Sequence, residues 1–490
     1  MYEAIVIGAG FGGMGATIQL KRMGIDSILI LEREDDLGGT WHVNHYPGLA
    51  VDIASVTYSY SFEPNPYWSR MFAPGVELKR YANHVADKYD LRRHMRFGTS
   101  VERAEWEPKG EFWRVTLNTG EILSSRYLFT ATGFLSQPRM PDIPGVDSFA
   151  GKVIHSAKWD DSYDLRGKRT ALIGTGATAV QLVPEVAKQV ESLTVYQRTP
   201  IWVVPKLDGP IPKPVQFAFA SVPLAQKAAR LANTAFLEAL SVGGVLHYKQ
   251  LHAANRGVGQ LAKAHLRAQV RDKELRTKLT PKYSFGCKRP TFSNDYYPTF
   301  NAPHVTLETT SIDHVEPDGI VTVDGNKTTI DTLLLCTGFN LWDTNFPALE
   351  IVGRDGRNLG KWWRENRFQA YEGVAIPRFP NFISLNSPYA YTGLSYFWTI
   401  ETQMKHIDRL FRSMRKRGLT TFEVRESANV DFLDRMTGNL DSSVFYRGNC
   451  AGSNSYYFDP RGEATLLRPT SLASGMREAG RFDVDDYAYS

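Results

Sequence analysis

Cysteine is scarce in this sequence of 490 residues, which contains Cys287, Cys336 and Cys450 and no others. Their number is odd, their spacing is wide, and no CxxC pair occurs. The sequence therefore indicates neither a zinc site nor a redox-active dithiol, and we expect no metal. A low cysteine content is typical of proteins in reducing compartments, so we expect a cytoplasmic location.

Long apolar runs and strong charge are also missing. No segment reaches the roughly 18 apolar residues of a membrane-spanning helix, and a strand-like segment begins too early to leave room for a signal peptide. We therefore expect no stable membrane span. The formal net charge of +5 suits anionic phosphate cofactors but is too small and too dispersed to indicate nucleic acid binding. Nothing in the sequence indicates a protein partner.

The composition is that of a globular protein, with 42% hydrophobic and 22% charged residues. A chain of this length is too long for one ordinary hydrophobic core. Two or three domains are therefore expected.

A glycine-rich loop follows the first apolar segment. Residues 4–7 (AIVI) are typical of a buried strand, and the loop Gly8-x-Gly10-x-x-Gly13 comes directly after them. A helical pattern then runs to about Met23, and a second apolar segment ends at Glu32. Strand, glycine loop, helix, strand and acid form the dinucleotide-binding fingerprint. The pyrophosphate would rest on backbone N–H groups at the start of the helix.

The same pattern occurs a second time. Residues 170–173 are strand-like and precede the loop Gly174-Thr175-Gly176-Ala177-Thr178-Ala179. A helix is predicted to about Lys188, and a further strand over 192–197 ends at Arg198. The sequence therefore predicts two dinucleotide sites.

The residue that follows the second strand of each motif distinguishes the two predicted sites. Glu32 lies 19 residues after Gly13, and Arg198 lies 19 residues after Ala179. An acid at this position accepts hydrogen bonds from free ribose hydroxyls, whereas an arginine accommodates a 2′-phosphate. The first site therefore fits FAD and the second fits NADPH rather than NADH, with Thr199 as a further donor to the phosphate.

These patterns predict an α/β fold with two Rossmann-like dinucleotide-binding domains. We expect an FAD-binding domain at 1–140, an NADP-binding domain at 141–336, and a return to the FAD-binding domain at 337–490. Residues of about 205–280 break the alternation with Ala, Leu, Lys and Arg at helical spacing, and we interpret them as a helical insertion. Helix–helix core packing is the favoured interpretation of this insertion, ahead of a role at the substrate or at a membrane surface.

The later part of the chain contains a polar loop, 386–395, before a helix predicted at about 397–417. Its last seventy residues or so contain a turn-rich segment and a tail that we expect to be loosely ordered.

The stretch Gly38 to Asp52 (GGTWHVNHYPGLAVD) has what a redox site needs. Glycines at 38 and 39 let the backbone approach a flat ring closely. Trp41 offers a large rigid face, and the sequence Tyr-Pro-Gly at 46–48 forces a turn. We expect Asp52 to direct its carboxylate back toward the ring.

Taken together, these motifs resemble those of the class B flavoprotein monooxygenases, and among them the Baeyer–Villiger monooxygenases. Gly38-Gly39-x-Trp41-x4-Tyr46-Pro47-Gly48-x3-Asp52 is similar to the first fingerprint of that family. Phe149-x-Gly151-x3-His155-x3-Trp159-Asp160 is similar to its second, more specific fingerprint. Both glycine loops have the expected order, and Lys288-Arg289 lies where the family has its active-site arginine.

The resemblance implies a reaction. NADPH would reduce FAD, and reduced flavin with O2 would give a C4a-peroxyflavin that attacks a ketone and yields an ester or lactone. Arg289 would keep the peroxide anionic and stabilise the adduct, and Asp52 would pair with it. Sulfide oxidation would be a side activity.

The resemblance also implies the cofactor contacts. Lys288 would reach the 2′-phosphate, Thr175 to Thr178 would hold the pyrophosphate of NADP, and Gln181 would lie near its nicotinamide. The full set of predicted cofactor-binding residues is Gly8, Gly10, Gly13, Glu32, Gly39, Thr40, Trp41, Asp52, Tyr58, Gly174, Thr175, Gly176, Ala177, Thr178, Ala179, Gln181, Arg198, Thr199, Lys288 and Arg289.

One stretch departs from the family. Its members often have a tryptophan in a C-terminal loop that orders over NADP, whereas this chain has Tyr456 and Tyr457 there. Three rival interpretations remain beside the ketone oxygenase. The first is a flavin monooxygenase acting on nitrogen or sulfur. The second is a flavin disulfide reductase, which would need a CxxC pair. The third is a flavin-binding redox sensor or scaffold that is not an enzyme, which would have no use for Arg289 opposite Asp52.

Overall fold

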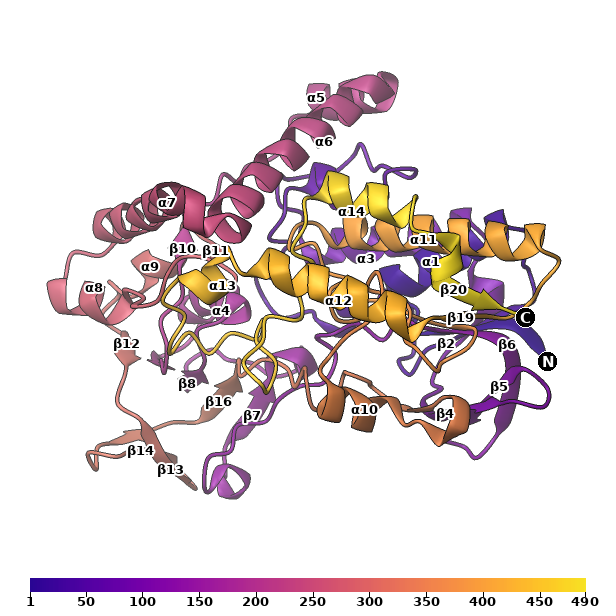
Figure 1. Cartoon of the computed structure of the whole chain (residues 1–490). Coiled ribbons are helices and arrows are strands. Elements are labelled where there is room, and N and C mark those ends of the chain that lie inside the picture. Colours follow the sequence, from indigo (N-terminus) through magenta and orange to yellow (C-terminus); the bar gives the residue numbers. More distant parts are fainter.

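A computed structural model describes all 490 residues, and two separate sheets organise them (Figure 1). The first sheet has eight strands around β1 (Tyr2–Ile7), which pairs in parallel with β2 (Ile28–Leu31) and β6 (Ile122–Thr130). The helix α1 (Phe11–Arg22) starts directly after the first glycine loop. The other strands are β3 (Met95–Arg96), β4 (Val101–Glu107), β5 (Phe112–Leu117), β17 (Glu350–Val352) and β18 (Phe382–Ser384).

The second sheet has five parallel strands in the order β12-β9-β8-β16-β7. The helix α4 (Ala177–Ala187) follows the second glycine loop, as α1 follows the first. The strands are β7 (Lys152–His155), β8 (Arg169–Ile173), β9 (Ser192–Tyr196), β12 (Val305–Glu308) and β16 (Thr332–Leu335). Distinct clusters of buried apolar residues surround the two sheets, so each unit has a core of its own. The predicted α/β fold with two Rossmann-like units is confirmed.

The chain returns to the first sheet after the second is complete, because β17 pairs with β4 and β18 pairs with β6. The helix α11 (Tyr396–Lys416) then packs on α1. The contact is close at Gly15, where the Cβ of an alanine would collide with the side chain of Ile400. The domain limits at 140 and 336 stay a prediction. Further helices on this side are α2 (Thr40–Val43), α3 (Gly75–Lys88), α10 (Leu359–Asn366), α12 (Glu426–Leu440) and α13 (Val444–Arg447).

The helical insertion is present as four α-helices and one π-helical turn. Figure 1 shows α5 and α6 projecting from the top of the molecule like an arm. The elements are α5 (Lys213–Ser221), α6 (Pro223–Glu238), η5 (Ala239–Leu246), α7 (Tyr248–Gln269) and α8 (Lys273–Leu279). The prediction that the insertion packs as a helix–helix core is wrong for α6. Leu231 is 69% and Phe236 58% exposed, whereas Gln226 and Arg230 are buried.

The C-terminal tail is ordered, contrary to expectation. It contains α14 (Leu472–Ala479) and β20 (Tyr487–Tyr489), which pairs with β19 (Phe422–Val424). Tyr487 is buried, and its hydroxyl lies 2.7 Å from His406 Nε2. This aromatic anchor explains why the tail is fixed. The remaining short elements are β10 (Val203–Val204), β11 (Thr291–Phe292), α9 (Tyr296–Thr299), β13 (Ile312–Glu316), β14 (Gly319–Thr322) and β15 (Lys327–Thr329).

Candidate functional site

One cavity of about 1280 Å³ is lined by both glycine loops, so the two predicted dinucleotide sites open into a common space. The carboxyl ends of parallel strands are where such folds bind ligands. The predicted residues that line the cavity are Gly8, Gly10, Glu32, Gly39, Thr40, Trp41, Asp52, Tyr58, Gly174, Thr175, Gly176, Ala177, Thr178, Arg198, Thr199, Lys288 and Arg289.

The two glycine loops have equivalent backbone geometry. Gly8 has φ of +108° and Gly174 has φ of +120°, and a Cβ at either position would clash with a carbonyl oxygen, that of Ala131 or Cys336. Each helix starts three residues later without a side-chain cap and without an acid in its first turn. The N–H groups at both helix starts are therefore free to bind an anion. Both loops fit the pyrophosphate of a dinucleotide.

Two predicted cofactor contacts, Gly13 and Ala179, do not line the cavity. A Cβ at Gly13 would collide with the carbonyl oxygen of Gly8, so this glycine allows α1 to pack closely on β1. Ala179 is fully buried in the core of the second unit. The residue at the third position of each motif therefore does not contact the cofactor. It allows the helix to pack closely against the strand, which is the known role of that position in the motif.

Glu32 directly follows β2 and is buried at the edge of the cavity. Its Oε2 accepts a hydrogen bond from the N–H of Ala9 (2.7 Å), and its Oε1 accepts one from the N–H of Glu34 (3.1 Å). Each carboxylate oxygen can accept a second hydrogen bond. The side chain is therefore fixed by the backbone and retains capacity for ribose hydroxyls.

The stretch that starts at Gly38 lies on the first glycine loop. A Cβ at Gly39 would come within 3.1 Å of the Cα of Gly10, so the two loops touch through glycines. Trp41 and Tyr58 meet edge to face with ring centroids 5.6 Å apart, and Tyr58 meets Phe397 in the same way at 5.1 Å. These rings form a rigid wall beside the first dinucleotide site.

Gln181 does not line the cavity, which corrects its predicted place near the nicotinamide. The hydroxyl of Tyr46 donates to its Oε1 (3.0 Å), and its Nε2 donates to the carbonyl oxygen of Ala50 (2.8 Å). Gln181 belongs to α4 of the second unit, whereas Tyr46 and Ala50 belong to the first. Its amide is therefore used to join the two units at the turn around Gly48.

Arg289 and Asp52 form the ion pair that the sequence predicts. Arg289 Nε donates to Asp52 Oδ2 (2.7 Å) and Nη2 donates to Oδ1 (3.1 Å), and both side chains are partly buried. Burial alone would lower the pKa of Arg289, but the charge of Asp52 outweighs burial and raises that pKa well above its ordinary value. Burial alone would raise the pKa of Asp52, but Arg289 outweighs it and lowers that pKa. Both groups therefore stay charged at any working pH.

A third residue, Tyr391, completes this arrangement and was missed from the sequence. Arg289 Nη1 donates to its hydroxyl (2.7 Å), and that hydroxyl donates to the carbonyl oxygen of Leu394 (3.2 Å). Tyr391 lies in the polar loop 386–395, directly after β18. The available signal was the position of this loop at the carboxyl end of a parallel strand, where ligands bind. The guanidinium is thus held on three of its nitrogens.

Arg198 and Lys288 form a positively charged site at the second dinucleotide loop. Both line the cavity, and Arg198 is exposed at the end of β9. Burial and, after it, repulsion from Arg198 lower the pKa of Lys288 to about 8. No carboxylate is among the groups that shift this pKa. Two cations without a counter-charge fit the 2′-phosphate predicted for this site.

We expect the catalytic efficiency with NADPH to fall as the pH rises through 8. The pKa of Lys288 in the free protein is about 8, so above that pH the ammonium group loses the proton that makes it a phosphate ligand. The loss approaches about tenfold per pH unit if binding requires the protonated form. The measurement is kcat/KM for NADPH between pH 7 and about 10, a range chosen to span this pKa.

Two controls make this result specific. Lys288→Arg should flatten the profile, because the pKa of a guanidinium lies far above this range. NADH lacks the 2′-phosphate and should show a much weaker dependence. A profile for NADPH that Lys288→Arg leaves unchanged would remove Lys288 from the phosphate site.

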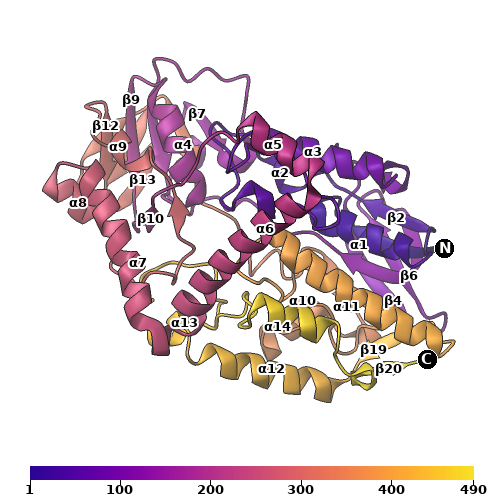
Figure 2. The ribbon, with the colours of Figure 1, turned by 90° about the horizontal axis from the view of Figure 1, so that it is seen from above.

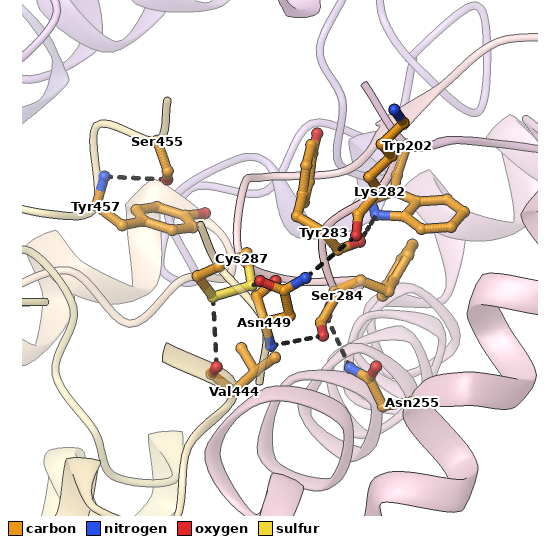
Figure 3. Close-up of a disulfide and its surroundings, with 12 residues drawn as sticks. Trp202, Asn255, Lys282, Tyr283, Ser284, Cys287, Val444, Asn449, Ser455 and Tyr457 are labelled. Atoms are coloured by element: carbon orange, nitrogen blue, oxygen red, sulfur yellow. Dashed lines mark hydrogen bonds between the residues drawn. A yellow bond between two sulfur atoms is a disulfide. The ribbon is translucent and has the colours of Figure 1, made fainter. Parts of the chain in front are cut away.

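A disulfide joins Cys287 to Cys450 (Figure 3). The sequence analysis did not predict this pair, because 163 residues separate the two cysteines and only the fold brings them together. Cys287 directly precedes Lys288 and Arg289. The bond therefore ties the segment with both cations to the C-terminal loop that contains Tyr456 and Tyr457.

That C-terminal loop lies against the second dinucleotide site. Asn454 Nδ2 donates to Thr199 Oγ1 (2.7 Å), and the carbonyl oxygen of Thr199 accepts from Thr175 Oγ1 (2.6 Å). Tyr456 lines the cavity, and Tyr457 is buried close enough to Arg289 to contribute to its raised pKa. The loop therefore covers the cavity with tyrosines in the place where the family often has a tryptophan.

No group of three or more His, Cys, Asp or Glu side chains is arranged to hold a metal ion. None of the helices combines the length and the apolar character needed to cross a bilayer.

Comparison with known proteins gives consistent matches. A family model described as pyridine nucleotide-disulphide oxidoreductase matches residues 5–208. A Baeyer–Villiger monooxygenase of Streptomyces coelicolor is 38% identical over 98% of this chain and 91% of its own length. Two solved structures are also similar: OTEMO in complex with FAD and NADP is 28% identical in sequence to this chain, and closed cyclohexanone monooxygenase is 27% identical to it. Each superposes with a TM-score of 0.87 over 100% of this chain and 99% of that chain.

The family model covers only residues 5–208, and this chain has no CxxC pair. The full-length similarity is to oxygenases. The chain therefore belongs to the Baeyer–Villiger monooxygenases, and it is a flavoprotein that uses FAD and NADPH.

Proposed function

We propose that this protein oxygenates ketones. One atom of O2 is inserted beside the carbonyl carbon, and the product is an ester or a lactone. The observation that carries this proposal is the guanidinium of Arg289, held by Asp52 and Tyr391 in the cavity that both dinucleotide loops share. Bound FAD, once reduced by NADPH, supplies the oxygen atom from O2.

The residues of the chain perform three tasks in this proposal. Arg289 stabilises the negative charge that develops on oxygen when a carbonyl carbon is attacked, because it stays charged and donates in a fixed geometry. Asp52 and Tyr391 fix the orientation of that guanidinium. Trp41 and Tyr58 form the wall that holds the flavin ring, and Arg198 with Lys288 binds the 2′-phosphate.

A panel of linear, cyclic and aromatic ketones with NADPH tests the proposal, with products identified by mass spectrometry. Esters or lactones that contain one more oxygen than the ketone are expected, and sulfides should give sulfoxides as a side activity. Oxygenation confined to nitrogen or sulfur compounds would contradict the proposal and favour the rival flavin monooxygenase. We propose a cytoplasmic location, because NADPH is an intracellular reductant; the disulfide between Cys287 and Cys450 is uncommon in such a reducing compartment.

A further inference from the structure

The helix α6 has its polar residues turned inward. Gln226 Nε2 donates to the carbonyl oxygen of Asn65 (2.7 Å), and Arg230 Nη1 donates to Ser59 Oγ (3.2 Å). Gln226, Arg230 and Thr234 are all buried and follow one another at intervals of four, so they form one face of the helix. This face is fixed to the protein by hydrogen bonds.

The opposite face of α6 is apolar and exposed. Leu224, Ala228, Leu231 and Ala235 repeat at intervals of four, three and four and form one stripe, with Phe236 beside it. Leu224 is 72% and Leu231 69% exposed. A helix on a protein surface normally turns its apolar side to the core. The inverted arrangement of α6 means that the apolar stripe has no partner within this chain.

Neighbouring side chains extend the stripe onto α5. Phe217 is 72% exposed, and Val215 and Val222 are exposed as well. Seen from above, α6 runs through the middle of the view with no other element in front of it, α5 lies next to α3, and α7 lies at the edge of the molecule (Figure 2). Exposed apolar side chains gathered on two adjoining helices indicate an interaction site.

The exposed charged side chains that α5, α6 and the first half of α7 carry are of one sign. Between residues 211 and 260 the exposed charged side chains are Lys213, Lys227, Lys249 and Arg256. The one acidic residue in this range, Glu238, accepts a hydrogen bond from the N–H of Leu472 (2.6 Å) and is thereby occupied. The partner of this surface must therefore be apolar at its centre and negatively charged around it.

We propose that the outer face of α5 and α6 binds the surface of a bilayer that contains anionic phospholipids. Acyl chains accept the leucine and phenylalanine side chains, and lipid phosphates pair with the lysines. No helix of this chain is suited to crossing a bilayer, which agrees with binding at the surface. A second copy of the chain fits less well, because a symmetric contact would bring the same lysines face to face.

The proposed docking face lies close to the cavity. Thr57 Oγ1 donates to Asn233 Oδ1 on α6 (3.2 Å), and Arg230 binds Ser59. These residues flank Tyr58, which lines the cavity. The membrane-bound side of the protein is thus the side on which α6 covers the wall beside the flavin site.

The test is flotation of the full-length protein, loaded with FAD and NADP⁺, with two kinds of vesicle. One kind contains equal parts of phosphatidylcholine and phosphatidylglycerol, and the other contains phosphatidylcholine alone. The wild-type protein should bind the anionic vesicles and release them in high salt. Leu231→Glu should weaken binding by about tenfold or more, because it places a charge in the apolar stripe. Lys213→Ala and Lys227→Ala should each weaken it about fivefold.

Val323→Glu provides the matched control. Val323 is equally exposed (61%), but it lies directly after β14, on the far side of the molecule from α5 and α6 in Figure 1. The Val323→Glu variant should bind anionic vesicles as strongly as the wild type. NADPH oxidation in solution should be the same for all variants, which shows that they fold.

Three outcomes would overturn the proposal. The first is wild-type protein that does not float with anionic vesicles. The second is a Leu231→Glu variant that floats as well as the wild type. The third is a wild-type dimer in light scattering that Leu231→Glu turns into a monomer, because the face would then be a contact between copies of this chain.

Discussion

Arg289→Ala is expected to lower ester formation by roughly 10³-fold while FAD binding and reduction by NADPH persist. The guanidinium is the permanent positive charge that Asp52 and Tyr391 hold in the cavity, and alanine removes it without touching either glycine loop. Such a loss corresponds to about 4 kcal/mol of transition-state stabilisation. The measurement compares ester formed with NADPH consumed, together with the flavin absorbance of the purified variant.

The neighbouring residues provide controls for this experiment. Arg289→Lys keeps a charge but cannot bond both oxygens of Asp52 and the hydroxyl of Tyr391 together, so most of the ester formation should still be lost. Lys288→Ala changes the adjacent cation and should raise KM for NADPH while each NADPH consumed still yields ester. Ester formation at the wild-type rate in Arg289→Ala would remove Arg289 from the reaction.

The second large effect concerns the choice between NADPH and NADH. Arg198→Ala should lower the ratio of kcat/KM values for NADPH and NADH by about 10- to 100-fold, the size of one charge-assisted hydrogen bond to phosphate. Arg198 follows the last residue of β9 by two positions and lines the cavity together with Lys288, and no acid pairs with it there. The loss should fall on NADPH, since NADH has no phosphate at that position.

Arg169→Ala is the matched control for this substitution. Arg169 starts β8 of the same sheet, at the end remote from the glycine loop, and its Nη2 lies 2.7 Å from Asp331 Oδ1. It should leave the cofactor ratio unchanged. If Arg198→Ala also leaves that ratio unchanged, the 2′-phosphate is bound elsewhere.

Local patterns in the sequence were sufficient for the parts of the fold that short segments determine. The first dinucleotide-binding fingerprint combines β1, the glycine loop, α1 and β2 within some thirty residues, and each element agrees with its prediction to within two residues. The ion pair of Arg289 and Asp52 was also predicted, although through the resemblance to a family rather than through spacing. The two partners of this pair are 237 residues apart, but each lies in a motif that can be recognised within its own stretch of chain.

Features that depend on long-range contacts were not predictable. Tyr391 reaches Arg289 only because β18 returns to the first sheet, and the partner of Cys287 is 163 residues away. The spacing of residues in α6 shows that the helix has two faces but not which face turns outward. That direction is set by acceptors such as the carbonyl oxygen of Asn65, which no pattern in the helix itself contains.

The disulfide limits how the loop over the cavity can move. Cys450 is bonded to Cys287, two residues before Arg289, so any displacement of this loop that keeps the bond intact must pivot after residue 450. Gly452 and Gly462 have φ of +70° and +80° and lie on either side of Asn454 and the two tyrosines. The segment of this loop that can move while the disulfide is intact is therefore limited to the roughly ten residues between Gly452 and Gly462. A thiol reductant in the assay buffer would release the anchor and lengthen that hinge, so oxidised and reduced preparations of this enzyme should be compared as two distinct samples.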